Sequence, residues 1–268
     1  MLIDTHCHLD FEQYHADLPE VIVRAADVGV TRIINPATDL ESGTNALALT
    51  QQYPNVYVAV GIHPNSTADY TENNLAAIEI QANNPKVVAI GEIGLDYYRD
   101  WSPKNQQRRA FEQQLDLAAR RRLPVIIHNR EASEDVIAVL AAWVAALPDE
   151  LKARPGVLHS FSAPHAIAEQ ALSLGFFLGF TGPLTYKNAD DLRSIAAAVP
   201  LDHVLVETDG PFLTPTPYRG KRNEPAYVRY TASRLAALRN LPDEEIDLAT
   251  TRNAERLFDL PALIDGKS

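Results

Sequence analysis

Residues 1–10 read MLIDTHCHLD, a short apolar run followed at once by two histidines, His6 and His8. Side chains two residues apart point to the same face of an extended chain, whereas on a helix they diverge by about 200°. If this stretch is a strand, both imidazoles converge on one point, which is typical of a metal site. Two unrelated histidines at a strand end are the simpler alternative, and the rest of the chain has to decide between them.

Short apolar runs rich in β-branched residues recur along the chain and alternate with segments of helical character. The predicted strands are Leu2–Thr5, Thr31–Asn35, Val56–Ile62, Val87–Ile93, Pro124–His128, Gly156–Phe161, Phe176–Phe180 and Val204–Thr208. Apolar residues at i, i+3 and i+4 predict helices over Ala110–Arg122, Ser133–Leu147 and Tyr227–Leu238. Alternating strands and helices indicate βαβ units, and eight such units in 268 residues predict an α/β fold of the (β/α)8 TIM-barrel type.

A doubly wound open sheet is the alternative architecture, but it normally carries a glycine-rich phosphate loop after its first strand. Residues 5–12, THCHLDFE, contain no glycine. No linker or internal repeat divides the chain, so we expect one domain over residues 1–262 and a frayed tail over 263–268. A helix over Asp243–Asp259 is expected to close one end of the barrel. The proline-rich stretch Gly210–Pro225 is too long for an ordinary turn and is expected to be a functional loop.

Composition narrows the possible partners. The formal net charge of −11 argues against tight, sequence-independent binding of duplex nucleic acid, although a substrate held locally by metal ions and a few arginines fits it. No apolar run is long enough to cross a membrane, and the N-terminus lacks the pattern of a secretory signal. The single cysteine, Cys7, excludes an internal disulfide and is expected to be a buried thiol rather than a ligand. We expect a cytoplasmic protein with no membrane association and no obligate protein partner.

Polar side chains collect at the carboxyl ends of the predicted strands, where a parallel barrel holds its active site. They are His6, His8, His63, Glu92, His128, His159 and Asp209. Unpaired buried charges cost several kcal/mol each, and no lysine or arginine lies on these strands to pair with Glu92 or Asp209. Divalent cations solve this problem, and the two glycines around Glu92, at positions 91 and 94, are expected to leave room for them. Seven groups exceed the four ligands of a closed zinc site, which favours two ions about 3.5–4 Å apart, bridged by a carboxylate.

Seven motifs, in order along the chain, resemble those of the TatD-related metal-dependent deoxyribonucleases, which are amidohydrolase-like TIM barrels that hydrolyse phosphodiesters. They are DTHCHLD, GIHP, GEIGLDYY, IIHNR, HSFS, ETDGPFLTP and RNAERLF. The resemblance implies two divalent ions, whether zinc, magnesium or manganese. One would be bound by His6, His8 and Asp209, and the other by His128 and His159. Glu92 would bridge the two ions.

The same resemblance implies contacts to substrate. His63 is expected to contact a substrate phosphate. The family commonly has a second histidine after GIHP, but this chain has Asn65 there, so that position is left out of the metal set. The loop YRGKRNEP, residues 218–225, resembles the family's substrate-binding loop, and its candidate residues are Arg219, Lys221, Arg222 and Asn223. An aromatic side chain at the mouth, from Tyr97, Tyr98, Trp101 or Phe212, is expected to stack on a terminal base.

A mechanism follows from the two ions. Water shared by two divalent cations loses a proton near neutral pH and can attack phosphorus, with Asp209 orienting it and accepting its proton. Asp209 and Glu92 are therefore the predicted catalytic residues. A single-stranded end is the expected substrate, because it can enter the mouth of the barrel, and the family resemblance implies trimming of DNA or RNA in the 3′–5′ direction. Two alternatives stay open at this point. One is a metal-dependent ester or amide hydrolase, acting for example on an aminoacyl ester or a lactone, and the other is a non-catalytic metal-binding scaffold.

Overall fold

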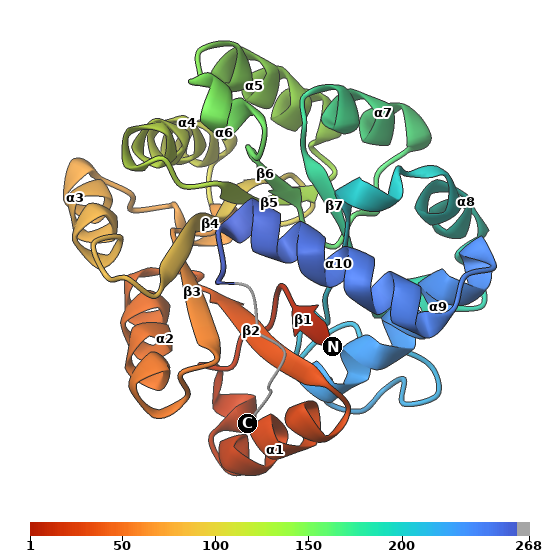
Figure 1. Ribbon diagram of the computed structural model, residues 1–268. Helices are drawn as coiled ribbons and strands as arrows, with labels where there is room; N and C mark the ends of the chain where they lie inside the picture. The colour runs from red at the N-terminus through yellow and green to blue at the C-terminus, as the bar shows by residue number, and fades with distance from the viewer. Residues whose placement is uncertain (262–268) are drawn as a thin grey trace.

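In the computed structural model, which describes residues 1–261, eight parallel strands form a barrel surrounded by helices (Figure 1). They pair in chain order: β1 (Leu2–Asp4), β2 (Val30–Pro36), β3 (Val56–Val60), β4 (Val87–Asp96), β5 (Val125–Arg130), β6 (Gly156–Leu158), β7 (Phe177–Phe180) and β8 (Val204–Val206). Backbone hydrogen bonds join β1 to β8, from Thr5 N to Val206 O and from His8 N to Gly210 O. The predicted single-domain (β/α)8 barrel is confirmed. The predicted tail, residues 263–268, lies outside the described residues.

Helices cover the outside of the barrel and alternate with the strands (Figure 1). They are α1 (Leu18–Asp27), α2 (Leu40–Gln52), α3 (Glu72–Gln81), α4 (Lys104–Arg121), α5 (Ser133–Ala145), α6 (Asp149–Lys152), α7 (His165–Ser173), α8 (Asp190–Ala198), α9 (Val228–Arg239) and α10 (Asp243–Phe258). Short 3₁₀ turns are η1 (Glu12–Tyr14), η2 (Pro64–Ser66), η3 (Gly182–Thr185), η4 (Leu201–His203) and η5 (Pro225–Tyr227). Helix α4 begins six residues before its predicted start, because its first turns, KNQQRR, are mostly polar and show no apolar periodicity. Across residues 1–261, no helix combines the length and apolar character needed to cross a membrane.

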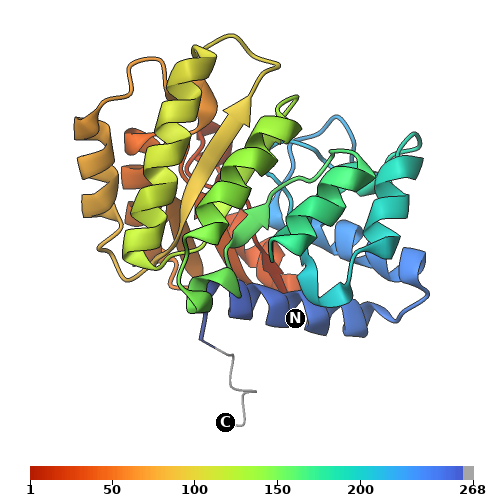
Figure 2. The same ribbon diagram turned by 90° about the horizontal axis from the view of Figure 1, so that it is seen from above.

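Helix α10 closes the amino-terminal end of the barrel, as predicted (Figures 1 and 2). Inward-pointing strand residues fill that end together with side chains of α10. This inner core comprises Ile3, Ile34, Ala59, Val88, Ala89, Ile126, Val157, Phe177, Leu205, Ala254, Leu257, Phe258 and Leu260. The opposite, carboxyl-terminal end is left open to the loops that carry the polar residues.

Several strands end earlier than predicted, and four of the candidate ligands lie just beyond a strand; of these, only His159 was predicted inside one. His6 and His8 follow β1, His159 follows β6, and Asp209 follows β8. His6 and His8 therefore lie at the carboxyl end of the first strand, as predicted, just past its last paired residue. Their alternation nevertheless persists, because a bridge between Cys7 and Gly210 extends the pairing past both strands. Cys7 is fully buried and its Sγ lies 3.6 Å from the Tyr14 hydroxyl, as expected for a structural thiol.

Candidate metal centre

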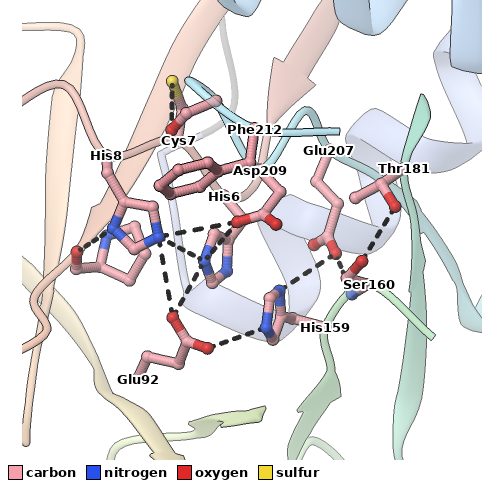
Figure 3. Close-up of polar contacts among 12 residues, drawn as sticks. His6, Cys7, His8, Glu92, His159, Ser160, Thr181, Glu207, Asp209 and Phe212 are labelled. Atoms are coloured by element: carbon pink, nitrogen blue, oxygen red, sulfur yellow. Dashed lines mark hydrogen bonds and ion pairs between the residues drawn. The ribbon is translucent and has the colours of Figure 1, made fainter. Parts of the chain in front are cut away.

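At the open end of the barrel, His6, His8 and Asp209 point toward one another (Figure 3). The two Nε2 atoms of the histidines lie 3.3 Å apart. Oδ1 of Asp209 lies 3.7 Å from Nε2 of His6 and 3.6 Å from Nε2 of His8. The backbone of Asp209 has a φ of 56°, in the left-handed region. This conformation turns the carboxylate back into the barrel. Three ligand-type atoms from two ends of the chain therefore surround one point.

Glu92, on β4, presents one carboxylate oxygen to His6 and His8 and the other to His159 (Figure 3), and this second oxygen also faces His128. Its Oε2 lies 3.3 Å from Nε2 of His6 and 3.8 Å from Nε2 of His8. Its Oε1 lies 2.8 Å from Nδ1 of His128 and 2.9 Å from Nε2 of His159. A carboxylate divided in this way between two groups of imidazoles has the geometry of a bridging ligand.

The remaining ring nitrogens of three histidines face acceptors on the outer side of the cluster. Nδ1 of His8 lies 3.1 Å from the Pro36 carbonyl oxygen. Nε2 of His128 lies 3.2 Å from Asp96, and Nδ1 of His159 lies 3.7 Å from Glu207. In His8 and His128, an N–H that donates to such an acceptor leaves the lone pair of the other nitrogen free to face the cluster, as in the outer shell of metal-bound histidines. Nδ1 of His6 and Nδ1 of His159 are both buried without a hydrogen-bond partner among the described residues, because 3.7 Å to Glu207 is too long for a hydrogen bond.

His63, on the loop after β3, differs from these histidines in its hydrogen bonding. Its Nδ1 accepts the backbone N–H of Asn65 at 3.1 Å, so the neutral ring carries its proton on Nε2. That Nε2 lies 3.5 Å from Oε1 of Glu92. Burial and the charge of His128 lower the pKa of His63, which favours the neutral ring. Although His63 lies close enough to Glu92 and His128 to share an ion, this tautomer makes it a hydrogen-bond donor toward the cavity.

The electrostatics of the cluster call for added positive charge. Burial raises the pKa of Glu92, but the charges and hydrogen bonds of His159, His63 and His128 outweigh burial and hold it well below its ordinary value. The pKa of Asp209 is lowered by neighbouring histidines in the same way, against the effect of burial. Within residues 1–261 no lysine or arginine reaches either carboxylate, so protons on the imidazoles must balance the charge.

His159 shows this compensation directly. Its burial disfavours the charged ring, yet Glu92 raises its pKa to about 10. By contrast, burial followed by the charge of His159 lowers the pKa of His6 to about 4. Divalent cations would replace such protons, and imidazole together with carboxylate is a donor set that suits zinc, manganese, iron or nickel. The residues present therefore fit the metal dependence that the sequence predicts.

Three buried acids beside the cluster were not identified from the sequence. Asp96 faces His128 and also accepts a hydrogen bond from the Asn65 side chain at 3.1 Å. Glu207 faces His159 and accepts the backbone N–H of Ser160, and burial raises its pKa to about 7. Asp4 accepts hydrogen bonds from Thr208 and from the backbone of His6. The available signal was an acidic residue inside an apolar strand motif, in GEIGLDYY, LVETD and LIDTH.

The glycines around Glu92 have a different role from the predicted one. A Cβ atom at Gly91 would lie 2.7 Å from Cβ of Ile126. Gly94 has a φ of +145°, and a Cβ there would lie 2.0 Å from the carbonyl oxygen of His128. The prediction that these glycines leave room for ions is therefore wrong. They let β4 approach β5 closely, which brings Glu92 within reach of His128.

A cavity of about 770 Å³ opens above the cluster. His63 lines it, and so do two residues predicted to stack on a base, Trp101 and Phe212. Arg99 and Arg130 also line it, and neither was identified from the sequence, although Arg130 ends the motif IIHNR and Arg99 directly follows GEIGLDYY. Tyr98 is the exposed ring between these two arginines, whereas Tyr97 donates its hydroxyl proton to Asp135 and does not line the cavity.

The loop after β8 differs from its prediction. Asn223 is fully buried and its amide donates to the carbonyl oxygens of Thr208 and Phe212. Arg222 is paired with Asp17 on the loop before α1, at 2.6 and 2.8 Å. Both side chains hold the loop in place and neither lines the cavity, so we do not retain them as substrate contacts. Arg219 and Lys221 are exposed, outside the cavity lining.

Parallel barrels with imidazole and carboxylate groups gathered at the carboxyl end form a large class of metal-dependent hydrolases, and comparison with known proteins places this chain in that class. Within the class, the chain belongs to the TatD related DNase family, whose model matches residues 3–259. The resemblance noted from the sequence motifs is confirmed.

Individual relatives agree over nearly their whole length. The chain is 45% identical to the uncharacterized metal-dependent hydrolase YabD of Bacillus subtilis, over 96% of this chain and 99% of YabD. It is 35% identical to the 3′-5′ ssDNA/RNA exonuclease TatD of Edwardsiella piscicida, over 97% of this chain and 100% of that protein. The crystal structure of YjjV, a TatD homologue from Escherichia coli, matches with a TM-score of 0.90 and 36% identity, covering 97% of this chain and 98% of YjjV.

Proposed function

We propose that this chain uses two divalent metal ions to hydrolyse phosphodiester bonds at the 3′ end of single-stranded DNA or RNA. His6, His8 and Asp209 would hold one ion. His128 and His159 would hold the other, and Glu92 would be shared between them. The division of the Glu92 oxygens between the two histidine pairs supports this allocation. The printed activity of the Edwardsiella piscicida relative supports the substrate class.

The observation that carries the phosphodiester assignment is a pair of arginines on the cavity wall. Arg130 lies over the ring of Tyr98, with Cζ 3.8 Å from the ring centroid, and Arg99 lies between Tyr98 and Trp101 at 5.2 and 5.0 Å. Neither guanidinium forms an ion pair with a carboxylate in the described part of the chain. Two fixed and uncompensated cations beside a metal cluster suit a substrate with more than one phosphate. A neutral amide or lactone would leave them without a partner.

Aromatic side chains favour a frayed or single-stranded end. Trp101, after β4, is 63% exposed, and Phe212, after β8, is 49% exposed, although both line the cavity. Strands β4 and β8 lie on opposite sides of an eight-stranded barrel, so the two rings can flank a base that enters between them. Stacking of this kind contributes about 1–3 kcal/mol per base and tolerates any sequence. A base held inside a duplex does not offer its faces to such rings.

The chain's own residues have defined roles in this reaction. When bound, the two ions lower the pKa of a water molecule and neutralise the phosphate oxygens. Asp209 accepts the proton of that water at its carboxylate, because it is ionised and lies at the edge of the cluster. His63 donates a hydrogen bond from Nε2 to a phosphate oxygen. Arg99 and Arg130 hold the adjacent phosphates, which fixes the scissile bond over the cluster.

The test is digestion of end-labelled oligonucleotides, offered as single strands, duplexes and covalently closed circles, with magnesium, manganese or zinc. The proposal expects a ladder from the 3′ end of single strands, slow digestion of blunt duplexes, and intact circles. Glu92→Gln is the matched inactive control, because it keeps the side-chain shape and removes the charge. Cleavage of circles would contradict the exonuclease assignment. Absence of any nucleic-acid cleavage with all three metals, together with hydrolysis of an aryl ester or lactone, would replace it with a carbonyl hydrolase.

A further inference from the structure

A second, shallower groove lies beside the mouth of the barrel, between η3, α8 and α9, with a volume of about 490 Å³. Its walls carry Tyr186 and Lys187 after η3, Arg193 on α8, and Tyr230 and Arg234 on α9. None of these residues belongs to the metal cluster or to the cavity above it. The groove is therefore separate from the proposed metal site.

Two chain segments lead from the cavity into this groove. In the first, Pro183 lines the cavity and Thr185, two residues further on, lines the groove. In the second, Leu213 lines the cavity and Thr216 lines the groove. The segments are tied together where they enter the groove, since the backbone N–H of Thr216 donates to Oγ1 of Thr185 at 2.9 Å. The groove is thus a lateral continuation of the active-site mouth.

The charge in the groove is positive, although the whole chain carries −11. Lys187 and Arg234 line the groove, and Arg219 lies over the Tyr186 ring at 4.1 Å. Among residues 1–261 none of these three cations forms an ion pair. Arg193 differs, because its guanidinium is bonded to Asp190 and to the carbonyl oxygens of Tyr186 and Lys187, and so it shapes the groove instead of offering free charge.

Aromatic rings accompany the free cations. Tyr186 and Tyr230 line the groove. Tyr230 packs edge-on against Tyr218 and Tyr227, which stack on each other at 4.6 Å between ring centroids. The Tyr186 hydroxyl donates to the Thr214 carbonyl oxygen at 3.1 Å, which fixes that ring against the loop after β8. Rigid aromatic rings alternating with unpaired cations are the usual means of holding a nucleic-acid single strand without reading its sequence.

We propose that this groove is a binding track for the nucleotides that lie 5′ of the reacting end. The terminal nucleotide occupies the cavity over the metal cluster. The strand leaves it across η3, and its phosphates then contact Arg219, Lys187 and Arg234. The proposal rests on the proposed function, since it assigns the groove to the same single-stranded substrate. Its consequence is a dependence of binding on strand length, which the cavity alone would not produce.

The test compares a long and a short substrate in a double charge-reversal variant, Lys187→Glu with Arg234→Glu. The long substrate is a 5′-labelled single strand of about ten nucleotides, within the range of known single-strand grooves. The short substrate is bis(4-nitrophenyl) phosphate, which does not extend beyond the cavity. The control variant, Lys152→Glu with Arg252→Glu, makes the same charge change near the closed end of the barrel, on α6 and α10.

For the groove variant we expect KM for the oligonucleotide to rise about tenfold or more, with kcat nearly unchanged and the small diester unaffected. The logarithmic salt dependence of oligonucleotide binding, measured by fluorescence anisotropy, should fall by about 0.7 per lost phosphate contact. The control variant should match the parent chain in both assays. The proposed binding track would be contradicted if both variants changed KM for the oligonucleotide equally. It would also be contradicted if the groove variant changed KM equally for the oligonucleotide and the small diester. If the parent chain hydrolyses neither substrate, the proposed function fails, while oligonucleotide binding by the two variants still decides the track.

Discussion

The two ends of the barrel both bury charged side chains, but they balance the charge in different ways. At the closed end, Arg32 is 2% exposed and pairs with Glu255 of α10 at 2.5 Å. It also donates to the Pro261 carbonyl oxygen at 2.6 Å. At the open end, Glu92 is 3% exposed and its ion-pair partners in the described chain are all histidines, which carry charge only when protonated.

This difference in charge balance distinguishes the closed end, which stabilises the fold, from the open end, which carries the proposed chemistry. The closed end pairs its charges within the chain, so their balance needs no added ion, although Nε of Arg32 has no hydrogen-bond partner among the described residues. The open end completes its charge balance only when a cation or a substrate arrives. Substitutions at the two ends should therefore separate activity from stability.

The largest effect is expected from Glu92→Gln. The amide keeps the size of the side chain but removes the anion shared by both histidine pairs, so both proposed metal positions weaken together. Turnover of a phosphodiester should fall by more than about 10⁴-fold, the upper end of the loss of a single general base. Bound metal per chain, measured by elemental analysis, should fall in parallel. The melting temperature of the metal-free variant should not fall. Retention of one full metal equivalent with normal affinity would show that Glu92 is not a bridge.

The next largest effect is expected from Asp209→Asn. The variant side chain keeps an oxygen directed at the cluster but cannot accept a proton. We expect a loss of about 10²–10⁴-fold in kcat, with smaller changes in metal content and none in cooperative unfolding. Single-turnover rates of the metal-loaded variant are the measurement. A folded variant with near-normal kcat would remove Asp209 from the mechanism, and a variant that fails to fold would place it with the stabilising residues of the closed end.

The features that the sequence predicts, the strands and the convergence of the polar groups, depend only on local sequence pattern and on one rule of barrel topology. Apolar runs marked the strands, and the carboxyl ends of parallel strands meet at one mouth. His128 and Glu92, for example, are brought together by the pairing of β4 with β5, although 36 positions separate them in the chain. The convergence of the seven polar groups could therefore be predicted before any contact was known.

The features that were missed depend on contacts that no local pattern reports. Arg222 resembles a substrate-binding residue until Asp17, 205 positions away, is seen to hold it. Arg99 follows β4 and Arg130 ends β5, and only the fold places both beside Tyr98. Asp96 and Glu207 lie within apolar motifs, where an acid could have been a cap, a core residue or a partner of a histidine. Side-chain pairing across the barrel, and not strand prediction, limited the assignment of the site.

At the closed end, Arg32→Met should destabilise the fold and spare the chemistry. Removing one partner of a buried ion pair leaves the other without compensation, which costs about 3–5 kcal/mol. Urea unfolding should show this loss in the free energy of unfolding. The metal-loaded variant, assayed well below its melting temperature, should keep kcat within about twofold, less than the smallest general-base effect. Adding Glu255→Leu should recover most of the stability, since it removes the uncompensated carboxylate. A fall in kcat as large as that of Asp209→Asn would break the division between the two ends.

The smallest effect concerns Asp4, which lies beside the cluster at the open end but is bonded to backbone N–H groups and to Thr208. It is fully buried and accepts three hydrogen bonds, from the backbone N–H groups of His6 and Thr208 and from the Thr208 hydroxyl. Burial outweighs these bonds and raises its pKa to about 8, from an ordinary 3.8. Between those values the folded chain keeps a proton that the unfolded chain has lost. The contribution of Asp4 to stability is therefore complete below about pH 4 and is lost as the pH rises toward 8.

Asp4→Asn removes this titration and keeps the acceptor for the backbone N–H groups. The free energy of unfolding of the metal-free chain, measured in urea between about pH 5 and pH 8, should fall with pH more steeply in the parent than in the variant. The difference in slope should approach, and not exceed, about 1.4 kcal/mol per pH unit. Other titrating groups are common to both chains and cancel in the difference. Parallel curves would mean that the three donors keep Asp4 ionised, which would place it with the charged, cation-dependent residues of the open end.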